Sequence, residues 1–406
     1  MSHIEMDSTS TVRPVPTETP GHISESVPAS RSGDPVQGGC GATTERGCGS
    51  LASSSESGSD DWASANETES SMVRESLDSG SAVKEALASL YSPILAPLAD
   101  VENRLDEELR SPHDSLMPVL RHGTQLGGKR LRPAMLLLAG QAVGDLTDDH
   151  TVLGAVIEMV HTATLVHDDV LDEADTRRHV PTINARWNEH TSILIGDYLF
   201  AQSFRLAATL PSTEACRMIG EAARLVCEGE LRQVLGRDAI ELDEETYYDI
   251  IRGKTAELCR VACELGAKFS GGGGATVHAM GRFGDCLGIA FQIADDFLDL
   301  WGDDETVGKT LGTDIGQGKM TLPLIRLLET ASAEDRDAIV RILEGPVEKR
   351  LSGIQPFLRN SDAREYTRRT AEDFKQRALE SLDCLPPSQA KNSLRQLASF
   401  SVDRRF

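Results

Sequence analysis

The stretch TVLGAVIEMVHTATLVHDDVLD, residues 151–172, determines the predicted fold. Its residues are apolar around most of a helical surface, which predicts a long buried helix over Thr151–Glu173. The stretch ends in Asp168-Asp169-Val170-Leu171-Asp172, here called the first aspartate motif. A second apolar helix is predicted over Met280–Trp301, and it ends in Asp295-Asp296-Phe297-Leu298-Asp299, the second aspartate motif. Unpaired carboxylates are costly on buried helices, so a cation must offset them.

The spacing within each motif lets its three carboxylates share one helical face, because they lie three and four residues apart. Solvated acidic helix ends could explain one copy, but they oppose the helix dipole, and two copies on apolar helices argue against that interpretation. Oxygen ligands without cysteine favour a hard cation, and Mg²⁺ typically takes one or two carboxylates plus substrate phosphates. Neither motif has the loop of a calcium EF-hand.

Basic residues near the motifs predict anion binding. The segment Gly127-Gly128-Lys129-Arg130-Leu131-Arg132-Pro133 places three cations in a loop just before a helix, which suits a diphosphate. Further cations occur at Arg177, Arg178, Lys254, Lys309 and Lys319. A solvated surface would explain any single pair. Together, in an acidic protein, they predict several diphosphate contacts around a magnesium cluster.

Composition excludes other classes of function. The 406 residues include 41 Lys and Arg against 64 Asp and Glu, a formal net charge of −23. This balance argues against binding to nucleic acid or to an anionic membrane face. The eight cysteines show no zinc-ligand spacing and no signal peptide precedes them, which predicts reduced, buried thiols.

The first 80 residues differ from the rest. Residues 1–80 hold 13 acidic and 4 basic residues and 18 serines, which predicts a disordered tail. They show neither a secretory signal nor the basic pattern of a transit peptide, so a cytoplasmic location is expected. No apolar run is long enough to span a bilayer.

Residues 81–406 are predicted to form one all-α domain. Strand-like alternation is nearly absent, Pro133 is expected at a first helical position, and Gly271–Gly274 is read as a loop between helices. Besides the two motif helices, helices are predicted over 134–142, 191–209, 214–235, 244–269 and 321–343 and onward to the C-terminus, and 82–110 is expected to be mostly helical with a bend or interruption at Pro93 and Pro97.

These motifs occur in a family order, and over roughly residues 85–406 the chain resembles the all-trans polyprenyl diphosphate synthases of the isoprenoid synthase superfamily. The resemblance is carried by the two DDxxD motifs, GGKRLRP, Arg177-Arg178, Gly253-Lys254-Thr255, FQIADD at 291–296 and Gly312-Thr313-Asp314. It implies a helical bundle around a central cavity, usually a homodimer, that joins isopentenyl diphosphate head to tail to an allylic diphosphate. His179 departs from the family, which usually has glycine there.

The resemblance also implies residue roles. Asp168, Asp172 and Asp295 would bind Mg²⁺, with about three ions per site when substrate is bound, supported by Asp169, Asp296 and Asp299. Isopentenyl diphosphate would contact Lys129, Arg132, His161 and Arg178. The allylic diphosphate would face Arg177, Lys254, Thr255, Gln292, Lys309 and Lys319. Without the motifs, His161 would be read as a hydrogen-bonded core histidine. Arg404-Arg405 could equally close over a diphosphate or fray.

Product length is predicted from the helix before the first motif. Helical side chains lean toward the N-terminus, so Val160, Ala163 and Thr164 should line the cavity below Asp168. Short-chain relatives carry bulky aromatics at the fourth or fifth position upstream, where this chain has Thr164 and Ala163. We therefore expect a product of about thirty to fifty carbons, of the kind used for quinone side chains. Product release allows a transient membrane contact.

Four alternatives follow from the same residues. A short-chain synthase would need a closed cavity floor. A terpene cyclase usually carries Asn, Ser and Glu at its second metal site. A metal-dependent phosphohydrolase using His161, His167 and Asp168 would lack further ligands and leave the second motif unexplained. An inactive subunit of a heteromeric synthase typically loses one aspartate motif, and both are intact here.

Overall fold

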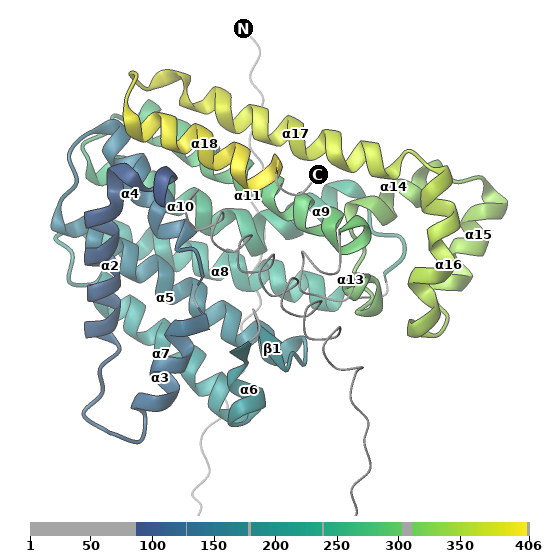
Figure 1. Ribbon diagram of the computed structural model, residues 1–406, viewed down its shortest axis with the longest axis horizontal. Coiled ribbons are helices and arrows are strands. Elements are labelled where there is room, and N and C mark those ends of the chain that lie inside the picture. The colour runs from purple at the N-terminus through teal and green to yellow at the C-terminus, as the bar shows by residue number, and fades with distance from the viewer. Residues whose placement is uncertain (1–86, 127, 178–179, 238, 303–310, 404–406) are drawn as a thin grey trace, which may run out of the picture. The chain divides into compact units, whose positions relative to one another are not determined.

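The computed structural model describes residues 87–126, 128–177, 180–237, 239–302 and 311–403. The chain divides into two units, Met1–Ala65 and Asn66–Phe406, and every described residue belongs to the second. The described residues are predominantly helical, which confirms the predicted all-α fold (Figure 1). The predicted tail over 1–80 and its boundary with 81–406 lie outside the described residues.

The first half of the described chain contains a short 3₁₀ turn, seven α-helices and one small hairpin. In chain order these are η1 Ser92–Ile94, α2 Leu95–Glu108, α3 Met117–Leu126, α4 Leu131–Val143, α5 Asp148–Leu171, β1 Thr176–Arg177, β2 Val180–Pro181, α6 Ile183–Arg186, α7 Glu189–Ala207 and α8 Thr213–Leu235. The two strands are antiparallel, with Thr176 opposite Pro181 and Arg177 opposite Val180.

The second half contains the remaining helices and a π-helical turn. In chain order these are α9 Glu244–Ile251, the π-turn η2 Arg252–Ala256, α10 Glu257–Phe269, α11 Gly274–Trp301, α13 Thr313–Gly316, α14 Leu322–Thr330, α15 Ala333–Leu343, α16 Val347–Asn360, α17 Ala363–Ser381, η3 Leu382–Cys384 and α18 Gln389–Asp403. None of the helices in the described ranges combines the length and apolar character needed to cross a bilayer.

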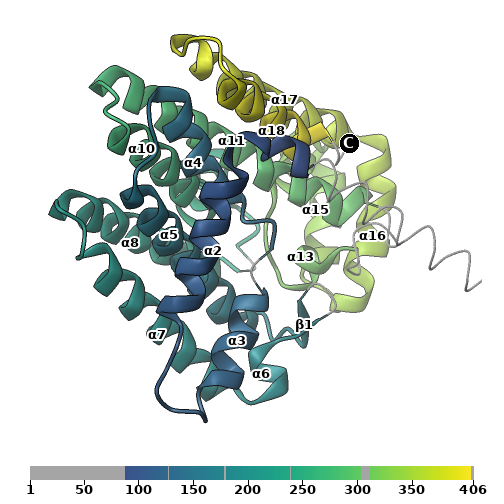
Figure 2. The same ribbon diagram turned by 60° about the vertical axis from the view of Figure 1, so that its left-hand side comes forward.

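The motif helices α5 and α11 lie in the main packing of the bundle. Helix α5 packs against α7, α4 and α2, and α10 packs between α4 and α11. Figure 2 shows α2 lying across α5. Consistent with its apolar sequence, α5 is buried through most of its length, including Val156, Ile157 and Met159. Packing rather than propensity therefore fixes the helix that ends in the first motif.

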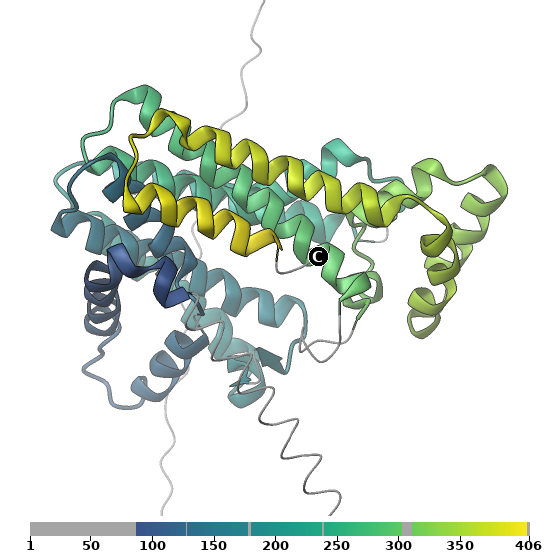
Figure 3. The ribbon, with the colours of Figure 1, turned by 45° about the horizontal axis from the view of Figure 1, so that its top comes forward.

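The C-terminal helices cover the helix of the second motif. Helix α17 runs along α11 and also contacts α14 and α18 (Figures 1 and 3). Near the N-terminal end of α17, helices α13 to α16 enclose a separate apolar cluster that includes Leu324, Leu343 and Leu358. The segments that follow the second motif are thus held by helices from the end of the chain.

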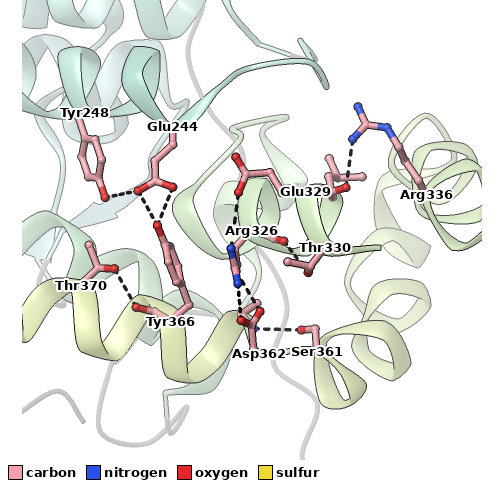
Figure 4. Close-up of polar contacts among 12 residues, drawn as sticks. Glu244, Tyr248, Arg326, Glu329, Thr330, Arg336, Ser361, Asp362, Tyr366 and Thr370 are labelled. Atoms are coloured by element: carbon pink, nitrogen blue, oxygen red, sulfur yellow. Dashed lines mark hydrogen bonds and ion pairs between the residues drawn. The ribbon is translucent and has the colours of Figure 1, made fainter. Parts of the chain in front are cut away.

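A polar network fastens α9 and α14 to α17 (Figure 4). The hydroxyl groups of Tyr248 and Tyr366 both donate to the carboxylate of Glu244, at 2.5 and 2.8 Å. The guanidinium of Arg326 lies 4.4 Å from the Tyr366 ring centroid and donates two hydrogen bonds to Asp362. Paired donors of this kind fix orientation as well as distance.

Several predicted helix boundaries were wrong. Pro133 is the third residue of α4, because the helix begins at Leu131 after a left-handed Arg130. The helix predicted over 321–343 is two helices, and the Ser332 hydroxyl caps the second by accepting from the Asp335 amide. The predicted helix over 244–269 is interrupted by the π-turn at Arg252–Ala256.

Other local predictions agree with the structure in whole or in part. Gly271–Gly273 form the loop between α10 and α11, and Gly274 begins α11. Within the described ranges all six cysteines are free, but only Cys259 and Cys263 are buried, so the prediction of buried thiols was wrong for the exposed Cys227 and Cys384. At the start of the described chain, α2 begins only at Leu95, after the 3₁₀ turn that contains Pro93.

Candidate active site

The first aspartate motif lies at the C-terminal end of α5, where three cationic side chains meet it. Asp169 accepts two hydrogen bonds from the Arg177 guanidinium, both at 2.8 Å. Asp172 caps α5 and lies 3.3 Å from Arg237 and 3.5 Å from Lys319. In the described part of the chain, no donor lies within hydrogen-bond distance of the Asp168 carboxylate, and burial raises its pKa to about 6.

The second aspartate motif ends α11 and is held by protein donors. The buried carboxylate of Asp296 accepts from the Tyr247 hydroxyl at 2.7 Å and from Gln292 at 2.9 Å. Burial and the nearby charge of Asp314 raise the pKa of Asp296 to about 7. Asp299 accepts from the backbone amides of Thr313 and Asp314, at 3.0 and 3.2 Å, and so caps α13.

Lys319 connects the two motifs. Its ammonium lies 3.5 Å from the Asp172 carboxylate and 3.6 Å from that of Asp314. The Asp314 backbone amide donates to Asp299. Residues from α5, α11 and the segment after α13 therefore converge, which is what a single site built from both motifs requires.

A π-turn supplies two further predicted residues. Lys254 lies 2.6 Å from Glu230 on α8, and the Thr255 hydroxyl donates to Gln292 at 2.8 Å. Gln292 in turn donates to Asp296. Although burial alone lowers the pKa of Lys254, the charges of Asp168 and Glu230 raise it above its usual range. π-Turns inside helices often occur at functional sites.

Two glycines bring the π-turn close to α8. A Cβ atom on Gly229 would lie 2.5 Å from the Lys254 backbone nitrogen, and one on Gly253 would lie 2.9 Å from the Leu225 carbonyl oxygen. Real side chains do not tolerate such contacts. The glycine pair thus permits the close approach that places Lys254 beside Glu230.

The residues predicted to bind isopentenyl diphosphate lie near the start of α4. Arg132 donates to His161 on α5, with 3.0 Å between Nη1 and Nε2. The ammonium of Lys129 lies 5.7 Å from the ring centroid of Phe400 on α18. Of the predicted isopentenyl diphosphate residues, Arg132 and His161 are therefore brought together, while Lys129 lies against α18.

Comparison with known proteins identifies the family. Residues 113–353 match the model of the polyprenyl synthetase family. The chain belongs to this family. Its similar relatives include the all-trans-nonaprenyl-diphosphate synthase (geranyl-diphosphate specific) of Rhodobacter capsulatus, with 37% identity over 78% of this chain and 97% of that protein. Another is the short chain isoprenyl diphosphate synthase of Methanothermobacter thermautotrophicus, with 35% identity over 74% and 95%.

Solved structures of the polyprenyl synthetase family share the fold. A decaprenyl diphosphate synthase from Rhodobacter capsulatus has a TM-score of 0.75 and 34% identity, over 79% of this chain and 99% of that one. A polyprenyl synthase from Caulobacter crescentus, complexed with calcium and isoprenyl diphosphate, has a TM-score of 0.73 and 34% identity, over 79% and 98%. The predicted family, fold and enzyme class, a trans-prenyltransferase, are confirmed.

The first motif of this polyprenyl synthetase suits the divalent cation on which the family depends. Asp168 is a partly buried carboxylate with a raised pKa and, within the described residues, no hydrogen-bond donor. No three carboxylate, imidazole or thiolate groups in the described ranges converge on one point. The Asp168 carboxylate is the feature that suits Mg²⁺, which typically takes one or two carboxylates together with substrate phosphates.

The three residues predicted to set the product length, Val160, Ala163 and Thr164, differ in solvent exposure. Val160 and Ala163 have no exposed surface and pack in the main apolar core. Thr164 is partly exposed, and its hydroxyl donates to the His161 carbonyl at 2.8 Å. Of the three, Thr164 is therefore the one whose side chain meets solvent-accessible space.

Sequence reasoning missed four contact residues. Glu230, Arg237 and Tyr247 lie on or beside α8 and α9 and contact Lys254, Asp172 and Asp296 respectively. Asp314 lies in the quoted Gly312-Thr313-Asp314 motif, but its contact with Lys319 depends on the fold. The first three residues belong to no sequence motif, although Tyr247 forms a recognisable tyrosine pair with Tyr248 shortly before Lys254.

Some predicted residues cannot be placed. Arg178 and Lys309 lie outside the described residues, as do His179, Arg404 and Arg405.

Proposed function

We propose that this chain joins isopentenyl diphosphate, repeatedly and head to tail, to an allylic diphosphate and releases a long all-trans polyprenyl diphosphate. The observation that carries the proposal is the position of Lys319 between Asp172 and Asp314. Two aspartate motifs connected by a lysine suit diphosphate groups, because metal ions and cations can share the phosphate charge.

The metal site in this proposal is shared between the motifs. Asp168, Asp172 and Asp295 would hold Mg²⁺, about three ions when substrate is bound, with Asp169, Asp296 and Asp299 in support. The bound metal would supply electrostatic stabilisation of negative charge on a departing diphosphate. The hydrogen bonds from Tyr247 and Gln292 to Asp296 support an orienting role for that carboxylate.

The cationic side chains complete the proposed chemistry. Arg177, Lys254 and Lys319 stabilise negative charge as the allylic carbon–oxygen bond breaks, and Lys309, Thr255 and Gln292 are the further residues proposed to contact the allylic diphosphate. Lys129, Arg132, His161 and Arg178 hold isopentenyl diphosphate. Its double bond attacks the allylic carbon, and a proton is then lost. The released diphosphate is the proposed proton acceptor, because no described side chain is placed as an evident base.

We propose a product of about thirty to fifty carbons, which suits a quinone side chain, because Thr164 and Ala163 are small where they lie before Asp168. Relatives from Rhodobacter capsulatus and Mycobacterium tuberculosis, the latter 36% identical, are named nonaprenyl diphosphate synthases. The second candidate is a short product, since a relative 35% identical is named a short chain isoprenyl diphosphate synthase.

A homodimer is the proposed assembly. A relative from Geobacillus stearothermophilus, 34% identical, is named heptaprenyl diphosphate synthase component 2, so a heteromeric assembly is the alternative. The purified chain, incubated alone with Mg²⁺, farnesyl diphosphate and isopentenyl diphosphate, tests both proposals. We expect long polyprenyl products. Products that stop at fifteen or twenty carbons would overturn the proposed length, and absence of any condensation would overturn catalysis by this chain alone.

A further inference from the structure

Arg130 is the middle cation of the Lys129–Arg132 loop, and its side chain enters the interface between α2 and α5. Its guanidinium donates to both oxygens of Glu102, at 2.5 and 3.0 Å, and to Glu158 at 2.8 Å. The side chains of Arg130 and Glu158 are only 15% and 2% exposed. Burial alone lowers the pKa of Arg130, but hydrogen bonds with Glu102 and the charge of Glu158 raise it above its usual range.

The backbone at Arg130 is left-handed, with φ of 50° and ψ of 38°. Side chains other than glycine rarely adopt this conformation, and it persists only where surrounding contacts impose it. Arg130 immediately precedes the first residue of α4, so this conformation sets the direction in which the loop enters the helix. The three hydrogen bonds to Glu102 and Glu158, together with the Arg130 carbonyl accepting from the Ala134 amide, are contacts that support it.

The residues on either side of Arg130 are tied to the same region. The Lys129 carbonyl accepts a hydrogen bond from the Tyr91 hydroxyl at 2.9 Å. Arg132 donates to His161, which lies one helical turn after Glu158 on α5. Anchoring Arg130 to Glu158 therefore fixes the loop relative to the helix that carries His161.

We propose that Arg130 is a positioning residue: its ion pairs with Glu102 and Glu158 hold Lys129 and Arg132 in place to bind isopentenyl diphosphate. This inference rests on the proposed function and adds to it a division of labour within the loop. Two cations bind the diphosphate, and the cation between them binds the protein. The family resemblance assigns diphosphate contacts to Lys129 and Arg132, and the contacts of Arg130 with Glu102 and Glu158 become apparent only in the structure.

The test measures Michaelis constants for both substrates in three variants of the full chain. Arg130→Lys keeps the charge beside Glu158 but loses the planar fork that reaches both carboxylates. We expect it to raise KM for isopentenyl diphosphate about tenfold or more, with KM for the allylic diphosphate and kcat changed less than about twofold. Arg104→Lys on α2 makes the same change in the ion pair with Glu108, and as the matched control it should change neither constant.

Glu102→Gln separates positioning from direct binding, and it spares the buried Glu158. If Arg130 itself bound the diphosphate, weakening its partner Glu102 would leave KM for isopentenyl diphosphate unchanged or lower. A positioning role predicts a higher KM in Glu102→Gln, in the same direction as in Arg130→Lys. Unchanged KM values in both variants, or equal rises for both substrates, would overturn the proposal. A wild-type chain that condenses no isopentenyl diphosphate would instead overturn the proposed function.

Discussion

The Lys319 ammonium lies 3.5 Å from the Asp172 carboxylate, although the two residues are 147 positions apart in the chain. Lys319 also lies 3.6 Å from Asp314, and its side chain is only 13% exposed. One cation thus offsets carboxylates contributed by the ends of two different helices. A charge in this position can hold the site together before substrate binds and contact the diphosphate afterwards.

Replacing this lysine tests its role in transition-state stabilisation. Lys319→Met should lower kcat/KM for the allylic diphosphate by roughly 10²-fold, because a preorganised cation near the departing diphosphate is lost. Steady-state kinetics with varied allylic substrate measure the effect. Lys268→Met is the control, since Lys268 pairs only with the partly exposed Glu214 among the described carboxylates. A Lys319→Met enzyme with wild-type kcat/KM would contradict the assignment.

Asp168→Asn should separate stability from activity. The folded protein raises the pKa of Asp168 from 3.8 to about 6. At neutral pH the ionised carboxylate is therefore less stable in the folded protein than in the unfolded chain. Asp168→Asn removes this charge and should raise the free energy of unfolding of the metal-free protein by on the order of 2–3 kcal/mol. Turnover should fall at least roughly 10²- to 10³-fold. Urea unfolding in EDTA and condensation assays measure the two effects. Loss of both stability and activity would show that the residue is structural.

Gly229→Ala should disturb the π-turn. The added methyl would meet the Lys254 backbone nitrogen, so α8 must move away and separate Lys254 from Glu230. We expect lower thermal stability and a loss of roughly tenfold or more in kcat, measured by calorimetry and condensation assay. Gly220→Ala on the same helix is the control, because its methyl would lie 3.8 Å from Phe204. Equal effects in both variants would contradict the close-approach argument.

The contacts that sequence reasoning missed share a physical cause. The pairs of Tyr247 with Asp296 and of Arg237 with Asp172 form only after helices distant in sequence have packed. The motifs and apolar periodicity predicted the two motif helices, because spacing and burial are local properties of the chain. The start of α4 was mispredicted because it depends on the tertiary contacts of Arg130, and the π-turn because it depends on the approach of two glycines.

His150 should make the fold sensitive to mild acid. It is buried at the start of α5, where Nδ1 accepts from the Thr147 amide at 3.0 Å and Nε2 donates to the Gly266 carbonyl at 3.1 Å. Burial lowers its pKa below 6.5, so the unfolded chain binds a proton first as pH falls. The stability that neutral His150 contributes is present above about pH 6.5 and is lost below it.

The urea midpoint of unfolding at pH 8 and pH 5.5 measures this loss. Between pH 8 and pH 5.5, the free energy of unfolding of the wild type should fall by up to about 1.4 kcal/mol more than that of His150→Gln. At pH 5.5, one unit below the pKa of an unfolded histidine, protonation of the unfolded chain stabilises it by about that amount. The absolute stability of the variant does not enter the comparison. If both proteins lost the same stability on acidification, His150 would not be the sensor.

Thr164→Phe should shorten the product. Among Val160, Ala163 and Thr164, only Thr164 has a partly solvent-exposed side chain. An aromatic ring at this position should therefore project into the space below Asp168. We expect the longest product to drop by several isoprene units while kcat for the first condensation changes little. Product sizing by mass spectrometry measures the shift. Thr151→Phe, near the other end of α5, should leave the product distribution unchanged.

The attachment of α9 and α14 to α17 has a consequence for biosynthesis. Tyr366 and Asp362 emerge from the ribosome long after both aspartate motifs, yet they fasten the segments that carry Lys254 and Lys319. A nascent chain can therefore form its motif helices while the cations that balance them are still unanchored. Arg177 and Arg237 can pair with the first motif before α17 docks, but the contacts that fasten α9 and α14 form only once one of the last helices has been synthesised.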